Sequence, residues 1–357
     1  MKARLFLPFL LLSIACETDE TTSSLTSSEA SRQLDRIADE LSSDIVSFAQ
    51  SEGLEAMTSF IDLLNTSTTL GRLGYQRKDG IALAKQQVAL INQYFVLGIA
   101  NLLEGGDDFW DNKGIYEWRF DSNEFELIRT SDTLAIAFPL EESNINNAEF
   151  RISEITFKTI DSEEYPTLIK ATMTINDPEE APFKAINLDF SSEFEMDDSL
   201  DKVTIALDVL PFSLTLALND SQSSTSSLFS QLLLNGENIK TIDASITFDS
   251  AEKLEPALIS GMVSYRSLQL IGSVDDEQLR NSEDGDPNDY IDLDVYIQES
   301  KAGHVFFLLE DVVEDGILYT DYIAYIQYED GETEKLEDIM EPVLNELDEL
   351  AEELEFD

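Results

Sequence analysis

Apolar residues recur at every second position in one segment after another between residues 114 and 328. Residues 186–196 place Ile, Leu, Phe and Met on one face, and Asn, Asp, Ser and Glu on the other. A period of two is typical of a β-strand with one solvated side. Strands without helical segments between them predict an antiparallel sheet. Similar segments lie at 132–138, 149–159, 167–175, 239–248, 290–298, 304–310 and 317–328.

Two of these segments depart from plain alternation. In 149–159 the apolar positions shift by one residue, which predicts a β-bulge near Ser153. The segment 317–328 is apolar or aromatic on both faces, so we expect a strand that is central or covered on both sides.

Helical periodicity precedes and follows the strands. Spacings of three and four predict helices at 34–49, 54–65 and 81–103, with Ser28 or Ser31 capping the first and Gly53 ending it. We predict an α+β fold in which N-terminal helices pack on a large curved antiparallel β-sheet, a meander or half-barrel. The helical region 32–103 and the β region 114–328 would form one domain. Residues 332–357 predict an acidic amphipathic C-terminal helix, either packed on the sheet or paired with a partner helix.

Acidic residues dominate the charge of the chain. It carries 73 Asp and Glu against 22 Lys and Arg, a net charge of −51. Such a field repels phosphate groups, so we exclude nucleic acid as a partner. Hydrophobic residues make up 43% of the chain, which argues for a packed core and against disorder.

The N-terminus combines a positive start with a short apolar run. Lys2 and Arg4 precede LFLPFLLLSIA, residues 5–15, and the only cysteine of the chain, Cys16, follows. The pattern is that of a secretory signal peptide, here 1–15, and the run is too short to span a bilayer. Ser13-Ile-Ala-Cys16 resembles a lipobox of bacterial lipoproteins, although Leu usually stands where Ser13 is. The resemblance implies a lipid anchor on Cys16. The alternative is cleavage after Ala15 that leaves a free thiol.

An acidic Ser/Thr-rich segment follows the cysteine. We interpret residues 16–31 as a tether. Glu17, Asp19 and Glu20 resemble the surface-export signal of lipoproteins in some Gram-negative bacteria, and the alternative is a solvated linker. The two resemblances imply a protein anchored in the outer membrane, on its periplasmic or cell-surface face.

Residues suited to catalysis are scarce. The chain contains one histidine, His304, and lacks a Gly-x-Ser-x-Gly motif, a phosphate loop and a dinucleotide fingerprint. A histidine in register with Phe306 and Leu308 is more often a structural residue. We therefore expect no enzyme; a hydrolase would need His304 and a carboxylate pair in one cleft.

The segment 284–294 is the best candidate for a metal site. Asp284, Asp286 and Asn288 match the first, third and fifth positions of an EF-hand-like Ca²⁺ loop, and Asp292 is a further oxygen donor. Asp289 stands where that loop needs Gly. The alternative is an acidic hairpin loop. Ca²⁺ is the only cofactor that the sequence suggests.

Aromatic residues provide candidate ligand contacts. Trp110 and Trp118 are able to stack on sugar rings, and Tyr322 and Tyr325 lie in the segment that is apolar on both faces. GIYEWRFDSNEFELIRTSDTLAIAFP, residues 114–139, resembles a segment of uncharacterised bacterial lipoproteins, which implies no activity.

The predicted arrangement of helices on a one-sided sheet resembles the half-barrel lipoprotein carriers and related lipid-binding envelope proteins. Two functions follow. The first is a lipid-anchored, non-enzymatic binding protein whose partner is an envelope protein, a glycan or a cation. The second is a carrier of a lipid or another apolar ligand in a groove between sheet and helices.

Overall fold

The computed structural model describes residues 24–66 and 113–343. Within the second range it leaves out 141–142, 161–162, 177–180, 196–199, 221–223, 250–255, 283–284 and 315–316. The chain divides into two compact units: unit 1 is Met1–Asp44 with Leu216–Asn345, and unit 2 is Ile45–Thr215 with Glu346–Asp357. The helix α2 (Ser27–Ala49) and the strand β8 (Phe212–Asn219) pass from one unit to the other.

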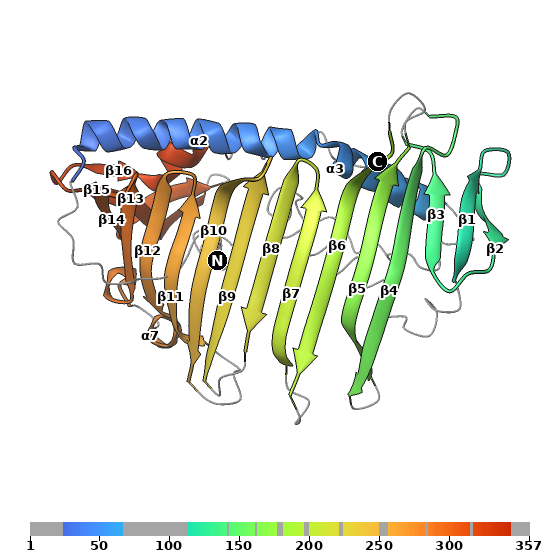
Figure 1. The fold of residues 1–357 in the computed structure, drawn as a ribbon. Coiled ribbons are helices and arrows are strands. Elements are labelled where there is room, and N and C mark those ends of the chain that lie inside the picture. Colours follow the sequence, from blue (N-terminus) through green and yellow to red (C-terminus); the bar gives the residue numbers. More distant parts are fainter. Residues whose placement is uncertain are drawn as a thin grey trace. The chain divides into compact units, whose positions relative to one another are not determined.

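Strands make up most of both units (Figure 1). From β3 onward each strand is hydrogen-bonded to the strand that follows it in sequence, so the predicted meander is confirmed. Unit 1 holds β9 (Thr225–Leu234), β10 (Glu237–Phe248), β11 (Pro256–Tyr265), β12 (Leu268–Asp275), β13 (Ile291–Ile297), β14 (Ser300–Glu314), β15 (Ile317–Tyr328) and β16 (Thr333–Lys335). Unit 2 holds β1 (Gly114–Arg119), β2 (Glu124–Arg129), β3 (Leu134–Phe138), β4 (Ala148–Ile160), β5 (Glu163–Ile175), β6 (Phe183–Phe194) and β7 (Leu200–Val209).

One pairing corrects the prediction of a purely antiparallel sheet. β1 pairs in parallel with β3 and antiparallel with β2, so the order at this edge is β3-β1-β2. The short segment between β2 and β3 therefore crosses over β1. The predicted bulge is confirmed, because the register of β4 against β5 shifts between Ile152 and Glu154.

The sheet of unit 1 has a buried face and an outer face. In β13, the residues Ile291, Leu293, Val295 and Ile297 are at most 6% exposed, and they alternate with more exposed Asp292, Asp294 and Tyr296. This is the period-two pattern that the sequence predicts for the segment 290–298. The side chains on the face opposite to the buried row form what we call the outer face.

Several tight turns lie together at one end of unit 1. The turns Asn235–Gly236, Arg266–Ser267 and Gln298–Glu299 join β9–β10, β11–β12 and β13–β14, and each includes backbone at positive φ. Consecutive antiparallel strands alternate ends, so these turns share one end with the β15–β16 turn. The other end holds the long connection between β12 and β13 and also the short step from Glu314 of β14 to Ile317 of β15.

The segment 275–289 contains two short helical elements. The helix α7 (Asp276–Asn281) and a 3₁₀ turn, Pro287–Asp289, occupy most of it, so the prediction of no helix between strands is wrong here. Asp275 caps α7, accepting a hydrogen bond from the backbone N–H of Gln278 at 3.0 Å. This helical turn is too short to show a period in the sequence.

Helix α2 begins earlier than predicted, within the expected tether. Thr26 and Glu29 form one half of a capping box: the Glu29 carboxylate accepts hydrogen bonds from the backbone N–H and the hydroxyl of Thr26 at 3.3 and 2.8 Å. The cap is therefore Thr26 and not Ser28 or Ser31. Asp330, in the β15–β16 turn, accepts a hydrogen bond from the N–H of Ser27 at 2.8 Å and fixes the start of the helix to the sheet.

The first helix ends before Gly53. It stops at Ala49, and α3 (Glu52–Thr66) follows with Ser51 as its cap. Gly53 lies inside α3, where a Cβ would be 2.7 Å from Val209 Cγ1 and 2.9 Å from the carbonyl oxygen of Ala185. The glycine is thus required for close packing of α3 on the strands of unit 2 and does not end a helix.

The C-terminal part begins as a strand. Residues 333–335 form β16 against β15, and helical residues follow at 336–343, so the helix predicted from 332 begins four residues later. β15 has the predicted bounds 317–328 but is the second strand from the edge, and β16 covers only its last part. The predicted helix 81–103 lies outside the described residues.

Candidate functional site

The first described residues, Ser24 and Leu25, pair with β14 beside the β13–β14 turn. Ser24 forms a parallel β-bridge with Lys301, and the N–H of Leu25 donates a hydrogen bond to the Lys301 carbonyl oxygen at 3.0 Å. These contacts lie eight residues after Cys16 in sequence. We call the residues around Lys301 the entry site.

Polar side chains gather on the outer face next to this bridge. The ammonium group of Lys301 lies 2.9 Å from Asp294 Oδ2 and 3.9 Å from Glu329 Oε1. His304 Nδ1 lies 3.2 Å from Asp294 Oδ1 and 3.7 Å from Asp292 Oδ1. β13, β14 and the β15–β16 turn supply these residues, and the register that pairs Asp294 with His304 brings the two side chains together.

The contacts of this cluster shift three pKa values. The hydrogen bond to Asp294 raises the pKa of His304 above its ordinary value, and this effect outweighs the opposing effect of burial. Burial favours a higher pKa for Asp294, but hydrogen bonds from His304 and Lys301 together lower it. Burial likewise opposes the charge of Lys301, but Asp294 and Glu329 raise its pKa. The group is an ion network of three carboxylates, one ammonium and one imidazole, and it resembles a structural ion cluster more than an acid–base pair.

We expect His304 to titrate above 6.5, its ordinary pKa. A raised folded-state pKa means that protonation stabilises the fold fully below about pH 6.5, and that this contribution is lost as the pH rises through the folded-state value. Because the side chain is 39% exposed, the contribution is small, below about 1 kcal/mol. NMR titration measures the pKa without assignment, since the chain has one histidine.

Asp294→Asn is the variant that tests the cause of this shift, and it should lower the measured pKa of His304. Asp292→Asn is the matched control with a smaller effect, because Asp292 is farther from the imidazole and its side chain is 82% exposed. A His304 that titrates at or below 6.5 in the unaltered protein would contradict the geometry.

The predicted Ca²⁺ loop is held together by contacts within the protein. Asp286 Oδ1 accepts hydrogen bonds from the backbone N–H and the side-chain amide of Asn288 at 3.0 and 2.6 Å. The Asn288 side chain also donates to the carbonyl oxygen of Phe307 at 2.8 Å and accepts from its N–H at 2.7 Å. These bonds fasten the loop to β14. Asp292 lies on the outer face beside His304, and Asp284 lies outside the described residues.

No group of three or more His, Cys, Asp and Glu side chains within the described ranges is placed to hold a metal ion. A Ca²⁺ site that includes Asp284 stays a prediction.

The structure describes three of the four aromatic residues that were predicted to contact a ligand. Trp118 is 6% exposed and packs edge-on against Phe125, with ring centroids 5.0 Å apart. Tyr325 is 8% exposed, donates a hydrogen bond to Glu310 and lies under the ammonium group of Lys335. Tyr322 is three residues away on the same strand and therefore points to the opposite face. Cys16 and Trp110 lie outside the described residues, and ligand binding by these aromatics stays a prediction.

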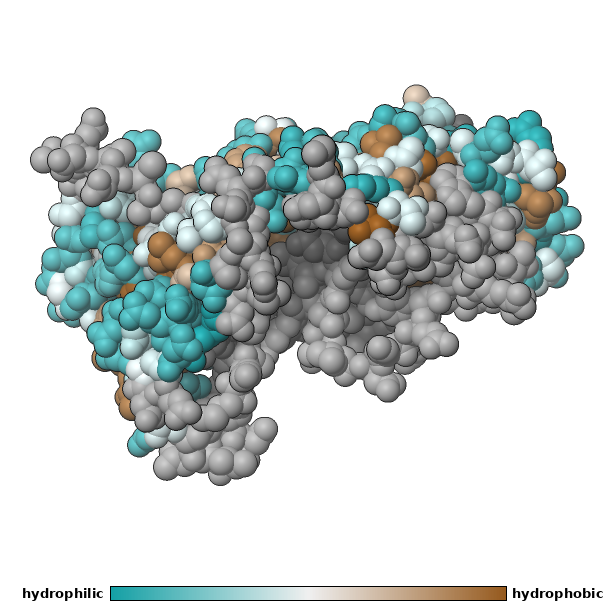
Figure 2. Space-filling model, turned by 90° about the horizontal axis from the view of Figure 1, so that it is seen from below, coloured by the Kyte–Doolittle hydropathy of each residue, from teal (hydrophilic) through white to brown (hydrophobic). Residues whose placement is uncertain are grey.

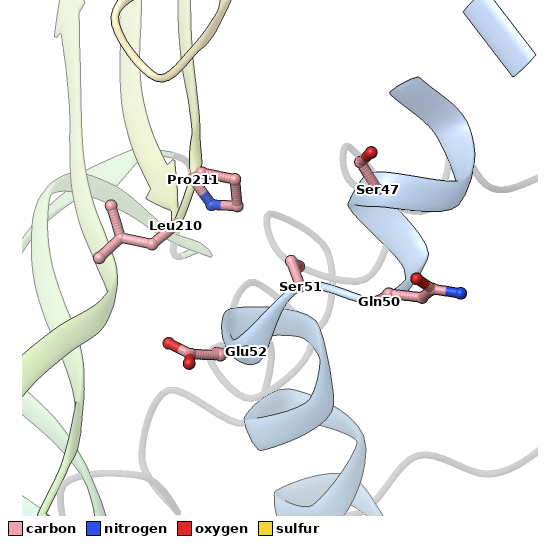
Figure 3. A pocket seen from close by; sticks show the side chains of 6 residues that line it. All are labelled: Ser47, Gln50, Ser51, Glu52, Leu210 and Pro211. Atoms are coloured by element: carbon pink, nitrogen blue, oxygen red, sulfur yellow. The ribbon is translucent and has the colours of Figure 1, made fainter. Parts of the chain in front are cut away.

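A hollow of about 360 Å³ lies in unit 2 where α2 ends and α3 begins (Figure 3). Leu210 and Pro211, in the β7–β8 turn, form its other side. Its lining is completed by Ser47, Gln50, Ser51 and Glu52. In Figure 3 the Gln50 side chain points away from Leu210 and Pro211. Among the described residues of this lining, Glu52 is the one with a titratable side chain.

Sequence reasoning missed one buried ion cluster. Asp44 on α2 accepts hydrogen bonds from the Arg266 guanidinium at 2.8 Å and from the Tyr265 hydroxyl at 2.6 Å. Glu40, one turn earlier, lies 3.7 Å from Arg266. Arg266 is in the tight β11–β12 turn at φ 49°. No local motif joins residues more than 200 positions apart. The Thr-x-x-Glu motif at 26–29, in contrast, was a readable signal of the helix start.

Side chains on the surface are mostly hydrophilic in the view of Figure 2, with small separated hydrophobic patches. Among the helices that the structure describes, none is long and apolar enough to cross a membrane. Comparison with protein-family models, with curated proteins and with solved structures finds no match to this chain.

Proposed function

We propose that this chain is an exported, lipid-anchored cell-envelope protein of the outer membrane that acts as a non-enzymatic binding protein. The observation that carries the proposal is the position of Cys16, the only cysteine of the chain, directly after an apolar run of signal-peptide length. In the structure, the chain first pairs with the sheet at Ser24, which is only eight residues after Cys16.

A short connection keeps unit 1 close to its anchor. Eight extended residues span at most about 28 Å. The lipid on Cys16 would therefore hold the entry site, and with it the tight-turn end of unit 1, near the membrane surface.

The tight-turn end is poorly suited to contact an anionic lipid surface directly. Glu299, Glu329, Asp330 and Glu332 are exposed there. Their charges repel anionic headgroups. Surfaces away from this end are therefore the ones available to a partner, whether that partner is an envelope protein, a glycan or a cation.

Mass spectrometry of the N-terminal peptide tests the anchor. The full chain, expressed in a Gram-negative host, should yield a mature N-terminus at Cys16 that carries acyl chains, and the protein should fractionate with membranes. The Cys16→Ala variant should lose both properties. An unmodified Cys16 at the mature N-terminus would refute the lipid anchor.

A half-barrel carrier of an apolar ligand is the second candidate, and Lys240 is the observation that favours it. Lys240 is half-buried in β10 and pairs with Tyr265, so it lies on the same face of the sheet as buried Val263. In the described part of the chain its ammonium group has no hydrogen bond or ion pair, and burial lowers the pKa of that group. A lipid with an acidic headgroup would supply the missing partner.

Native mass spectrometry of the full chain, with lipid extraction in parallel, separates the two candidates. A co-purifying lipid mass supports the carrier. A protein mass without bound lipid would exclude the carrier and leave the anchored binding protein.

A further inference from the structure

The outer face of unit 1 carries an ordered neutral surface across the strands β9–β12, which stand side by side in Figure 1. The registers of the three strand pairs place one residue of each strand in a common row. Rows that are two residues apart along the strands are about 6.6 Å apart, and neighbours within a row are about 4.8 Å apart. Three adjacent rows of four residues each make up this surface.

The first of the three rows contains only serine residues. Its members, which we call the serine row, are Ser227, Ser245, Ser260 and Ser273. They are exposed or half-buried. Within the described residues none of their hydroxyls takes part in a hydrogen bond. Four hydroxyl groups in line are therefore available to donate to and accept from a ligand.

The next row is mainly apolar, and the third is again neutral and polar. The apolar row consists of Phe229, Met262 and Ile271, with Asp243 between Phe229 and Met262; the amide row consists of Gln231, Thr241, Ser264 and Gln269. Phe229 is 38% exposed. An apolar line is thus flanked on both sides by hydroxyl and amide groups.

The charge of this surface differs from that of the rest of the chain. Asp243 is the one charged residue among the twelve positions, whereas charged residues make up 27% of the chain. The same face becomes charged at β13 and β14, where Asp292, Asp294 and Lys301 lie. A protein of net charge −51 therefore presents here a surface that an uncharged partner can cover while desolvating few charged side chains.

We propose that these three rows bind a linear, uncharged polysaccharide that lies across the strands. Sugar rings have apolar C–H faces, which would pack on the apolar row, and hydroxyls at their edges, which would bond to the serine and amide rows. Protein interfaces are enriched in aromatic residues and Arg and depleted of Ser, so the composition favours a glycan over a second protein. This inference rests on the proposed function as a binding protein and names its ligand class.

Affinity electrophoresis of the full chain, extracted in non-ionic detergent, tests the proposal. Native gels that contain laminarin, hydroxyethyl cellulose or dextran should retard the protein, and at least one of these three neutral polymers should do so in a saturable way. Alginate, which is anionic, should not. Retardation by none of the three would overturn the proposal.

Variants then test whether the rows are the site. Ser245→Ala with Ser260→Ala removes two hydroxyls and should weaken binding about tenfold, and Ser245→Glu with Ser260→Glu should weaken it further. Gln327→Glu with Thr333→Glu is the matched control: it adds two charges to the same outer face on β15 and β16 and should leave binding unchanged. Unchanged binding by the alanine variant would overturn the site, and this variant keeps the test valid if the glutamate variant does not fold.

Sedimentation equilibrium tests whether a second copy of this chain, and not a glycan, binds the three rows. A wild-type dimer that the serine variants convert to a monomer would assign the rows to a second copy and overturn the glycan proposal. The lipid analysis of Cys16 is independent of both measurements. Acylation without polysaccharide binding would refute this inference alone, whereas binding without acylation would refute the lipid anchor alone.

Discussion

Replacing Asp44 by Ala should lower the free energy of unfolding of unit 1 by about 2–4 kcal/mol. The Asp44 side chain is 10% exposed and is the close partner of the Arg266 guanidinium at 2.8 Å. It also accepts the hydrogen bond of the buried Tyr265 hydroxyl at 2.6 Å. Removing the carboxylate leaves a half-buried cation and a buried phenol without their acceptor, which costs more than the net value of the pair.

Glu40→Ala is the matched control for Asp44→Ala. Glu40 is on the same helix and faces the same guanidinium, but it lies 3.7 Å away and its side chain is 36% exposed. An exposed pair of this kind contributes less than about 1 kcal/mol. Urea unfolding of both variants measures the difference, since urea does not screen charges. Equal losses for the two variants would show that Asp44 does not hold α2 on the β11–β12 turn.

Gly272→Ala should be the most damaging single methyl addition in unit 1, with a loss of about 3 kcal/mol. A Cβ at this position would overlap the carbonyl oxygen of Asp292 and lie 2.9 Å from the Cα of Leu293. Both are backbone atoms of β13, so no side-chain rotation can relieve the overlap. The two strands would have to separate where they are hydrogen-bonded to each other.

Ser273→Ala provides the control for Gly272→Ala. Ser273 is the next residue of β12 and points to the outer face, where its hydroxyl has no partner in the described structure. Its loss should change the free energy of unfolding by less than about 0.5 kcal/mol. Thermal unfolding followed by circular dichroism compares the two variants. A Gly272→Ala protein as stable as Ser273→Ala would mean that β12 and β13 approach less closely than the structure places them.

Local periodicity was sufficient to predict much of the sheet. The segment 317–328 was predicted with the bounds that β15 has, and the frame shift near Ser153 corresponds to the bulge in β4. Both features arise from the alternation of side chains along a single strand, which the sequence contains directly. The meander order also followed, because neighbouring strands need only short connections.

Pairings between distant segments were not predictable in this way. The parallel pairing of β1 with β3 requires a crossover that no residue pattern marks. The contact of Asp44 with Arg266 joins a helix to a turn more than 200 residues later. β16 consists of three residues, which is too short to show a period, so it was absorbed into the predicted helix.

The candidate site was predicted less well than the fold. Asp292 and His304 were singled out separately, and only the register of β13 with β14 shows that they lie on one face. Trp118 was named for its aromatic ring, but burial against Phe125 is a property of the packed state that residue type alone does not show. The serine row is formed by four strands together and is invisible in any one of them.

The difference between the tight turns and the longer β12–β13 connection of unit 1 has a consequence for how the protein can change. A two-residue turn such as Asn235–Gly236 fixes the strand register, and an insertion there would shift every following side chain to the wrong face. The longer connection between β12 and β13, residues 276–290, should tolerate added residues, because it is not a tight turn that sets the register. Lineages of this protein should therefore keep the lengths of the tight turns and diverge in the longer connection, and an epitope tag or reporter domain is best inserted there.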